Sequence, residues 1–600
     1  MLSYRKLAMR VLGRPLHTEG IDSPRPASQR AAAFILTAAM LTTLAAPAFA
    51  DIWRIEDGDI TVKAGETKGT NKVSQGTTID KVDTNTIITG TSDTNTVTID
   101  TSKGNVDVTF DDLNIDASSR NEAAMSVTGS GNTTIKLDGD NHLTGGNGDT
   151  YGGDGIASTG SLTISGGETD SLTAQGGSGE NGGDGITSSG SLTISGGTVT
   201  ATGGNSTGIV GSGGSGIHSG GDVTISGGTV TATGGDSTGS DGSGGYGIYS
   251  SSTTTISGGT VTATGGDSTG SYSSGGYGIY SSGVTISGGS TVTANGGSGK
   301  DGSGDGIFSF DPVAISGGTV TAKGGSGEDG EDGGDGIRSF DPVAISGGTV
   351  TAKGGSGEDG SGGRGIISTK SVTISGGTVN ANGGSGKNGN GGNGIIGSGR
   401  VAISGGTVEA AGGNGGKVGG SVIDLSGSLE LTAKAGSPNG KALSQRGKEL
   451  DLNTIKDKLG PGAKVTTTDA DGKVIDQVPI PRPVEPEESS SSSDGGSSAP
   501  SASVSSLPGL TVTDKSGAVI SYTSTQSGNT LTVCVGRFTA SFRISLAALR
   551  QLRAEGIETI AFQTILCSTT LSVDELLAMG GEDAEAVLTH RFTDSSLTVG

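Results

Sequence analysis

The sequence predicts an all-β protein: a three-sided parallel β-helix with about 30 residues per coil, followed by a small α+β domain. Glycine accounts for 118 of 600 residues, whereas only 3% are aromatic and 30% hydrophobic, too few to fill several conventional globular cores. Collagen is excluded, because the glycines lack an every-third-residue period and there are only 14 prolines. The segment Ile-Ser-Gly-Gly recurs nine times at spacings of 29 to 31 residues, a period typical of a solenoid.

Each repeat contains three short pieces in which apolar and polar residues alternate, as in a strand with one buried face. They read Gly-Ile-x-Ser, Val/Leu-Thr-Ile-Ser-Gly-Gly and Thr-Val-Thr-Ala. Stacking the repeats aligns one isoleucine column from Ile156 to Ile395, a second from Ile164 to Ile403, and a valine column from Val199 to Val408. Three inward columns describe a three-sided coil, and the general preference for right-handed crossovers makes it right-handed. Glycine is expected at its corners and loops, because it adopts positive φ without steric cost.

The remaining elements follow from shifts in composition. Residues 450–459 predict a short helix, and Asp471-Gly472 a hairpin turn. Ser545 is the expected N-cap of a helix that Gly556 ends. The chain then has five predicted segments: a signal peptide at 1–50, the β-helix at 51–440, a C-terminal cap at 441–478, a Pro- and Ser-rich linker at 479–506, and the α+β domain at 507–600.

The N-terminus has the features of a secretory signal peptide. A basic leader precedes an apolar run from Ala31 to Ala46, and Ala48-Phe49-Ala50 forms a cleavage pattern before Asp51. A retained membrane anchor is the alternative, although the run is short for a spanning helix. We therefore expect a secreted, extracellular or surface-associated protein with no membrane contact after cleavage.

The net charge indicates which classes of partner the protein can bind, and the cysteine content indicates which disulfides it can form. The formal net charge is −23, from 38 Lys and Arg against 61 Asp and Glu, which disfavours nucleic acid. The only cysteines, Cys534 and Cys567, lie in the C-terminal domain. In an exported chain they could form one disulfide, and two free thiols are the alternative.

The outward position x of Gly-Ile-x-Ser concentrates ring-bearing residues. It carries His218, Tyr249, Tyr280 and Phe308 in four successive repeats, followed by Arg338. Neighbouring coils lie about 4.8 Å apart, so these side chains should stack, and Tyr246 and Tyr277 join them in two of the repeats. Rings with apolar faces and polar edges suit a carbohydrate-binding platform. A ladder that only stabilises the sheet is the alternative.

Acidic loops between the coils are candidate calcium sites, because carboxylates on Gly-rich turns supply the hard oxygen ligands that calcium prefers. Solvated carboxylates without a metal are the alternative. The candidate ligands are Asp154, Asp184, Asp305, Asp329, Asp332 and Asp335.

Two segments carry a family resemblance. Residues 106–115, Val-Asp-Val-Thr-Phe-Asp-Asp-Leu-Asn-Ile, and 133–143, Thr-Thr-Ile-Lys-Leu-Asp-Gly-Asp-Asn-His-Leu, precede the Ile-Ser-Gly-Gly-Thr-Val-Thr-Ala repeats. Together, over about residues 85–435, they resemble the β-helical carbohydrate-binding domain proteins of anaerobic bacteria. The resemblance implies a pectate-lyase-like fold and binding of acidic polysaccharide such as polygalacturonate with calcium. No ligand-contacting residue of that family aligns with a numbered position here.

The predicted function is polysaccharide binding, of a pectin-like acidic chain through calcium or of a neutral glycan. A surface adhesin or structural spacer is the alternative. We expect no enzyme, because the carboxylates lie in near-identical loops and no non-repeating catalytic constellation stands out; a polysaccharide lyase or hydrolase is the less favoured reading.

Overall fold

The computed structural model describes residues 51–327, 331–414, 422–425, 429–435, 442–445, 448–460, 462–469, 471–479, 509–513, 519–520, 522–527, 529–535, 540–563, 568–579, 584–590 and 595–599. The chain divides into two compact units between Glu485 and Pro486, within the predicted linker. The predicted signal peptide lies outside the described residues. Within them, no helix is long and apolar enough to cross a membrane.

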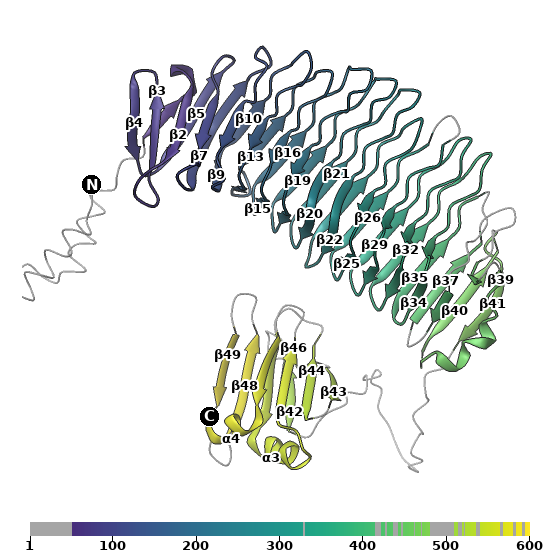
Figure 1. Ribbon diagram of the computed structural model, residues 1–600. Helices are drawn as coiled ribbons and strands as arrows, with labels where there is room; N and C mark the ends of the chain where they lie inside the picture. The colour runs from purple at the N-terminus through teal and green to yellow at the C-terminus, as the bar shows by residue number, and fades with distance from the viewer. Residues whose placement is uncertain are drawn as a thin grey trace, which may run out of the picture. The chain divides into compact units, whose positions relative to one another are not determined.

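The first unit is a parallel β-helix, as predicted (Figure 1). Strands pair in parallel with the strand one coil later, and the pairing register links equivalent residues of successive repeats, such as Ile186 with Ile217. The coil therefore has three faces, each a ladder of short parallel strands that runs along the helix axis.

The three faces are defined by their strands. The first contains β2 (Ile60–Ala64), β6 (Val97–Asp100), β8 (Met125–Thr128), β11 (Ile156–Ser158), β14 (Ile186–Ser188), β17 (Ile217–Ser219), the starts of β20 (Ile248–Ile256) and β22 (Ile279–Ile286), β24 (Ile307–Ser309), β27 (Ile337–Ser339), β30 (Ile366–Ser368) and β33 (Ile395–Gly397). The second contains β1 (Ile52–Arg54), β5 (Thr86–Ser92), the start of β7 (Val106–Asp116), β9 (Thr133–Asp138), β12 (Leu162–Ser165), β15 (Leu192–Ile194), β18 (Val223–Ile225), the ends of β20 and β22, β25 (Val313–Ile315), β28 (Val343–Ile345), β31 (Ser371–Ile374), β34 (Arg400–Ile403) and β36 (Val422–Leu425). The third contains the end of β7, β10 (Asp140–Thr144), β13 (Ser171–Gln175), β16 (Thr198–Thr202), β19 (Thr229–Thr233), β21 (Thr260–Thr264), β23 (Thr291–Asn295), β26 (Thr319–Lys323), β29 (Thr349–Lys353), β32 (Thr378–Asn382), β35 (Gly406–Ala411), β37 (Leu429–Lys434) and β40 (Lys464–Thr468).

The three predicted aliphatic columns form the core. Eight isoleucines of the first column, from Ile156 to Ile366, are fully buried, and only the last, Ile395, is partly exposed. The second isoleucine column and the valine column are buried over their full predicted lengths. Over the repeats this continuous core is narrow and contains no aromatic side chain, and only Trp53 and Phe110 of the first coils enter it. This accounts for the low aromatic content.

Glycine serves two structural purposes. In seven of the nine Ile-Ser-Gly-Gly segments the second glycine has positive φ, for example 80° at Gly197 and at Gly228, as the corner requires. The loop glycines before the first isoleucine column do not follow that prediction. A Cβ on Gly245 would lie 1.9 Å from the carbonyl oxygen of Gly214 in the preceding coil. Close backbone packing between coils, rather than positive φ, therefore selects glycine in these loops.

Both ends of the β-helix are closed by irregular elements. At the N-terminal end β3 (Asn71–Gln75) and β4 (Thr78–Asp83) pair antiparallel after a 3₁₀ turn, η1 (Ile55–Asp57). At the C-terminal end β40 forms the predicted hairpin with β41 (Val474–Pro479). The helix expected at 450–459 is instead two 3₁₀ turns, because so short a segment gains few α-helical hydrogen bonds. The small elements of this cap are β38 (Ser444–Gln445), β39 (Lys448–Glu449), η2 (Leu452–Thr454) and η3 (Lys456–Lys458).

The described residues of the C-terminal unit form two four-stranded sheets and two helices, in agreement with the predicted small α+β domain. Ser545 N-caps the first helix, and its hydroxyl accepts a hydrogen bond from the Ala548 amide. One sheet consists of β42 (Leu510–Thr513), β45 (Ala540–Ser545), β48 (Glu585–His590) and β49 (Ser595–Val599), the other of β43 (Thr523–Ser527), β44 (Thr530–Cys534), β46 (Thr559–Gln563) and β47 (Ser568–Ser572), and the helices are α3 (Leu546–Ala554) and α4 (Val573–Met579). The side chains of Cys534 and Cys567 lie outside the described part, so their disulfide stays a prediction.

Candidate functional site

A ladder of rings runs along the first face of the β-helix. His218, Tyr249, Tyr280 and Phe308 occupy equivalent positions of β17, β20, β22 and β24. Their ring centroids are separated by 4.6, 5.3 and 5.0 Å in that order. The tyrosine and phenylalanine rings are stacked nearly parallel, whereas His218 meets Tyr249 edge-on. The parallel register of the strands thus places the predicted ring residues side by side.

Tyr246 and Tyr277 form a second row beside this ladder. Each precedes the Gly-Ile pair at the start of its strand, and their rings stack on one another at 5.8 Å. Tyr246 also contacts Tyr249 at 5.4 Å and Tyr280 at 5.1 Å. Both rows therefore belong to one continuous surface, and burial raises the pKa of Tyr246 and of Tyr277, which keeps their hydroxyls protonated.

Two further rings were not anticipated from the sequence. Phe310 and Phe340 follow the first-face strands β24 and β27 and stack on one another at 5.7 Å. They are 44% and 38% exposed. The repeated segment Ser-Phe-Asp-Pro, at 309–312 and 339–342, was the available signal: each phenylalanine lies two residues beyond position x and so points to the same side of its strand.

Phe308 and Arg338 pack against the other rings of this surface. Phe308 is only 6% exposed, because Tyr277, Tyr280, Phe310 and Phe340 pack around it. The guanidinium of Arg338 lies 5.8 Å from the Phe308 ring and 5.7 Å from the Phe340 ring. We call the seven rings the aromatic face: Tyr246, Tyr249, Tyr277, Tyr280, Phe308, Phe310 and Phe340.

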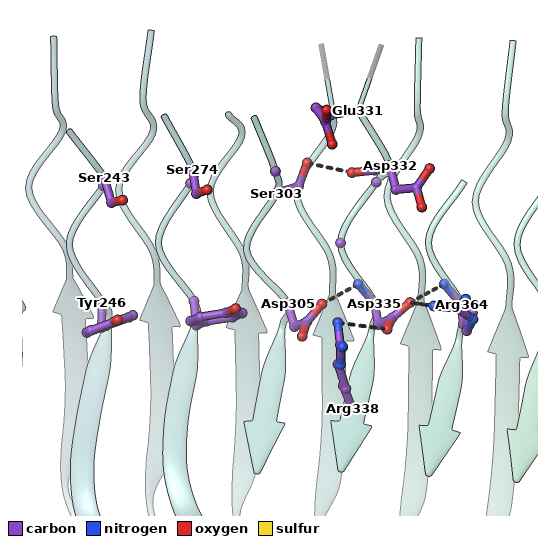
Figure 2. Close-up of a pocket in the computed structure, with 16 residues that line it drawn as sticks. Ser243, Tyr246, Ser274, Ser303, Asp305, Glu331, Asp332, Asp335, Arg338 and Arg364 are labelled. Atoms are coloured by element: carbon purple, nitrogen blue, oxygen red, sulfur yellow. Dashed lines mark hydrogen bonds and ion pairs between the residues drawn. The ribbon is translucent and has the colours of Figure 1, made fainter. Parts of the chain in front are cut away.

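A hollow of about 420 Å³ borders the aromatic face (Figure 2). Tyr246, Asp305, Asp335, Arg338 and Arg364 lie in its lower part, and Ser243, Ser274, Ser303, Glu331 and Asp332 lie above them. The polar side chains that line it are Ser243, Tyr246, Ser274, Tyr277, Ser303, Asp305, Glu331, Asp332, Asp335, Arg338 and Arg364.

Two buried carboxylates form the floor of the hollow. Asp305 and Asp335 are each 2% exposed. Asp305 Oδ1 accepts a hydrogen bond of 2.6 Å from the Asp335 amide, and Asp335 Oδ1 accepts one of 2.6 Å from the Arg364 amide. The other carboxylate oxygen of each residue has no hydrogen-bond partner among the described residues. Burial raises the pKa of both groups, and the charge of Asp335 adds to the increase at Asp305.

A second pair of carboxylates lies at the other end of the ring ladder. Asp154 Oδ1 accepts from the Asp184 amide at 2.8 Å, and Asp184 Oδ2 lies 2.9 Å from His218 Nδ1. Burial, reinforced by the charge of Asp184, raises the pKa of Asp154 to about 6. The hydrogen bond to Asp184 raises the pKa of His218 above its usual value.

The candidate calcium ligands that the structure describes are hydrogen-bonded between coils. The Asp154, Asp184, Asp305, Asp332 and Asp335 side chains each accept a backbone amide of the following coil, at 2.6 to 2.8 Å. They therefore act as hydrogen-bond acceptors that join coils. Among the described residues, no three His, Cys, Asp or Glu side chains gather to hold a metal ion. The remaining predicted ligand, Asp329, lies outside those residues.

Comparisons with known proteins agree with the fold. A family model described as a beta helix repeat matches residues 223–248, 255–279, 313–337, 343–366 and 372–395. No curated protein and no solved structure matches the chain. The family-model match within residues 223–395 and the three-sided ladder of strands both support a β-helix.

Proposed function

We propose that this protein binds polysaccharide through the aromatic face and acts without catalysis. The observation that carries the proposal is the row of rings aligned along the helix axis, with neighbouring centroids 5.0 to 5.8 Å apart. An extended glycan can lie along such a row, with the C–H faces of its sugars on the rings and its hydroxyls at their polar edges.

The exposure of the outer rings supports this proposal over a purely structural ladder. Rings that only stabilised the sheet could be covered by their neighbours, as Phe308 is. Phe310 and Phe340 are instead substantially exposed and parallel to one another. Contiguous exposed apolar surface of this kind is a common mark of a binding site.

The proposal includes export of the protein, with the extracellular medium or the cell surface as its location. The basic leader, the apolar run and Ala48-Phe49-Ala50 carry this part. Calcium is not needed for binding, because the candidate carboxylates already serve as acceptors between coils. Calcium-bridged binding of polygalacturonate is therefore the competing hypothesis.

A glycan array tests both hypotheses when it is probed with the purified protein in calcium and in EDTA. We expect binding to at least one polysaccharide that persists in EDTA, and its loss in the variant Phe310→Ala/Phe340→Ala. Binding that vanishes in EDTA would favour calcium bridging. Absence of any glycan binding would instead support the adhesin or spacer alternative.

A further inference from the structure

The hollow beside the aromatic face carries an excess of negative charge. Four carboxyl groups, from Asp305, Glu331, Asp332 and Asp335, line it together with two guanidiniums. Even if Asp305 and Asp335 share one proton, three carboxylates face two positive charges. Since the whole chain also has a net charge of −23, an anionic ligand would meet repulsion both at a distance and in the hollow.

The two guanidiniums are already engaged. Arg364 Nη1 lies 3.6 Å from Asp335 Oδ1, and Arg338 Nη1 lies 3.9 Å from Asp335 Oδ2. Arg338 also contacts the rings of the aromatic face. A sugar carboxylate at these guanidiniums would compete with Asp335 for their charge, and weakening the partners of a buried carboxylate is costly. The arginines therefore balance a buried carboxylate of the chain itself.

The hollow instead offers what an uncharged sugar uses. The rings of Tyr246 and Tyr277 contribute apolar surface to the hollow, and Ser243 and Ser274 lie in the row above Tyr246 (Figure 2). The carboxylates of Glu331 and Asp332 line the same hollow as hydrogen-bond acceptors, and neither side chain is buried. A ligand rich in hydroxyl donors complements this combination, and a carboxylate, which only accepts hydrogen bonds, does not.

We propose that the glycan bound at the hollow and along the aromatic face is an uncharged polysaccharide, not a uronic acid polymer. This inference rests on the proposed function and adds the class of ligand. It differs from the acidic ligand that the family resemblance implies, because the charges of this chain's own hollow oppose such a ligand.

The experiment compares the affinity of the protein for a neutral β-linked glucan with its affinity for polygalacturonate of similar length. Both are measured in EDTA and at low ionic strength, on an array that also holds amino-sugar polysaccharides. We expect a neutral glycan to bind at least about tenfold more tightly than polygalacturonate. The variant Glu331→Gln/Asp332→Asn removes two negative charges from the rim of the hollow. It should raise the ratio of polygalacturonate affinity to neutral-glycan affinity roughly threefold.

A matched control variant removes the same number of negative charges at positions outside the hollow. Glu180 and Asp241 are exposed loop residues that do not line the hollow, so Glu180→Gln/Asp241→Asn should leave both affinities near wild type. Tighter binding of polygalacturonate or of an amino-sugar polymer than of every neutral glycan would overturn the inference. If that binding were lost in Phe310→Ala/Phe340→Ala, the proposed function would stand while the ligand class fell. No binding to any glycan would overturn both.

Discussion

The close packing of loop glycines predicts a large loss of stability from one added methyl group. Gly276 lies one residue before Tyr277, and a Cβ there would be 1.8 Å from the carbonyl oxygen of Gly245. Real Cβ contacts are essentially never shorter than 3.0 Å, so Gly276→Ala requires the two loops to separate by about 1.2 Å, from that difference.

Such a separation would break hydrogen bonds between neighbouring loop segments. The Gly266 amide donates to Gly245 O at 2.8 Å, and the Gly247 amide donates to Tyr277 O at 2.9 Å. A shift of this size lengthens both beyond normal hydrogen-bond distance. Two lost hydrogen bonds and the steric strain together predict a destabilisation of about 3 kcal/mol. Urea unfolding followed by circular dichroism measures it.

Gly289→Ala is the matched control, because a Cβ there has no atom within 4 Å. Its free energy of unfolding should stay within about 0.5 kcal/mol of wild type. If Gly276→Ala were as stable as this control, close backbone packing would not be the reason for glycine in the loops, and the account of the 118 glycines would fail.

Three further predictions concern titration and redox state. The pKa of Asp154 is raised to about 6, so the native state binds more protons than the unfolded state between about pH 4 and 6, and stability falls as pH rises through this window. Asp154→Asn should remove that pH dependence and raise the free energy of unfolding by up to about 3 kcal/mol at pH 7. Equal denaturant midpoints for the wild type and the variant at both pH 4 and pH 7 would contradict this prediction. The pKa of the His218 imidazole, measured by NMR, should fall in Asp184→Asn because its hydrogen bond to that carboxylate is weakened; an unchanged titration would show that the pair does not interact in solution. Thiol labelling under denaturing, non-reducing conditions should find neither Cys534 nor Cys567 reactive if they form the predicted disulfide, and two labelled thiols would refute it.

The repeat made the fold predictable in detail. Equivalent residues such as Ile186 and Ile217 sit one coil apart because the period and the strand alternation together fix the register. The same reasoning placed Tyr249 beside Tyr280. The predicted surface comprised position x and the residue before Gly-Ile, so it did not include Phe310 and Phe340, which lie two residues beyond x.

The roles of the acidic residues could not be predicted in the same way. Asp305 and Asp335 are 30 residues apart, and only the stacked coils bring the carboxylate of one to the amide of the other. Arg364 meets Asp335 from yet another coil. A sequence shows which loops are acidic, but not whether their oxygens are free for a metal or already bonded to the backbone.

The central claim is that the aromatic face binds polysaccharide, and the affinity of a ring variant tests it most directly. Tyr249→Ala/Tyr280→Ala removes two stacked rings from the face, whereas Tyr151→Ala/Tyr272→Ala removes two tyrosines that are 67% and 70% exposed outside it. For the best glycan on the array, titration calorimetry should show at least about a tenfold weaker Kd for the first variant and a Kd near wild type for the second. Equal affinity of both variants and the wild type would contradict the claim.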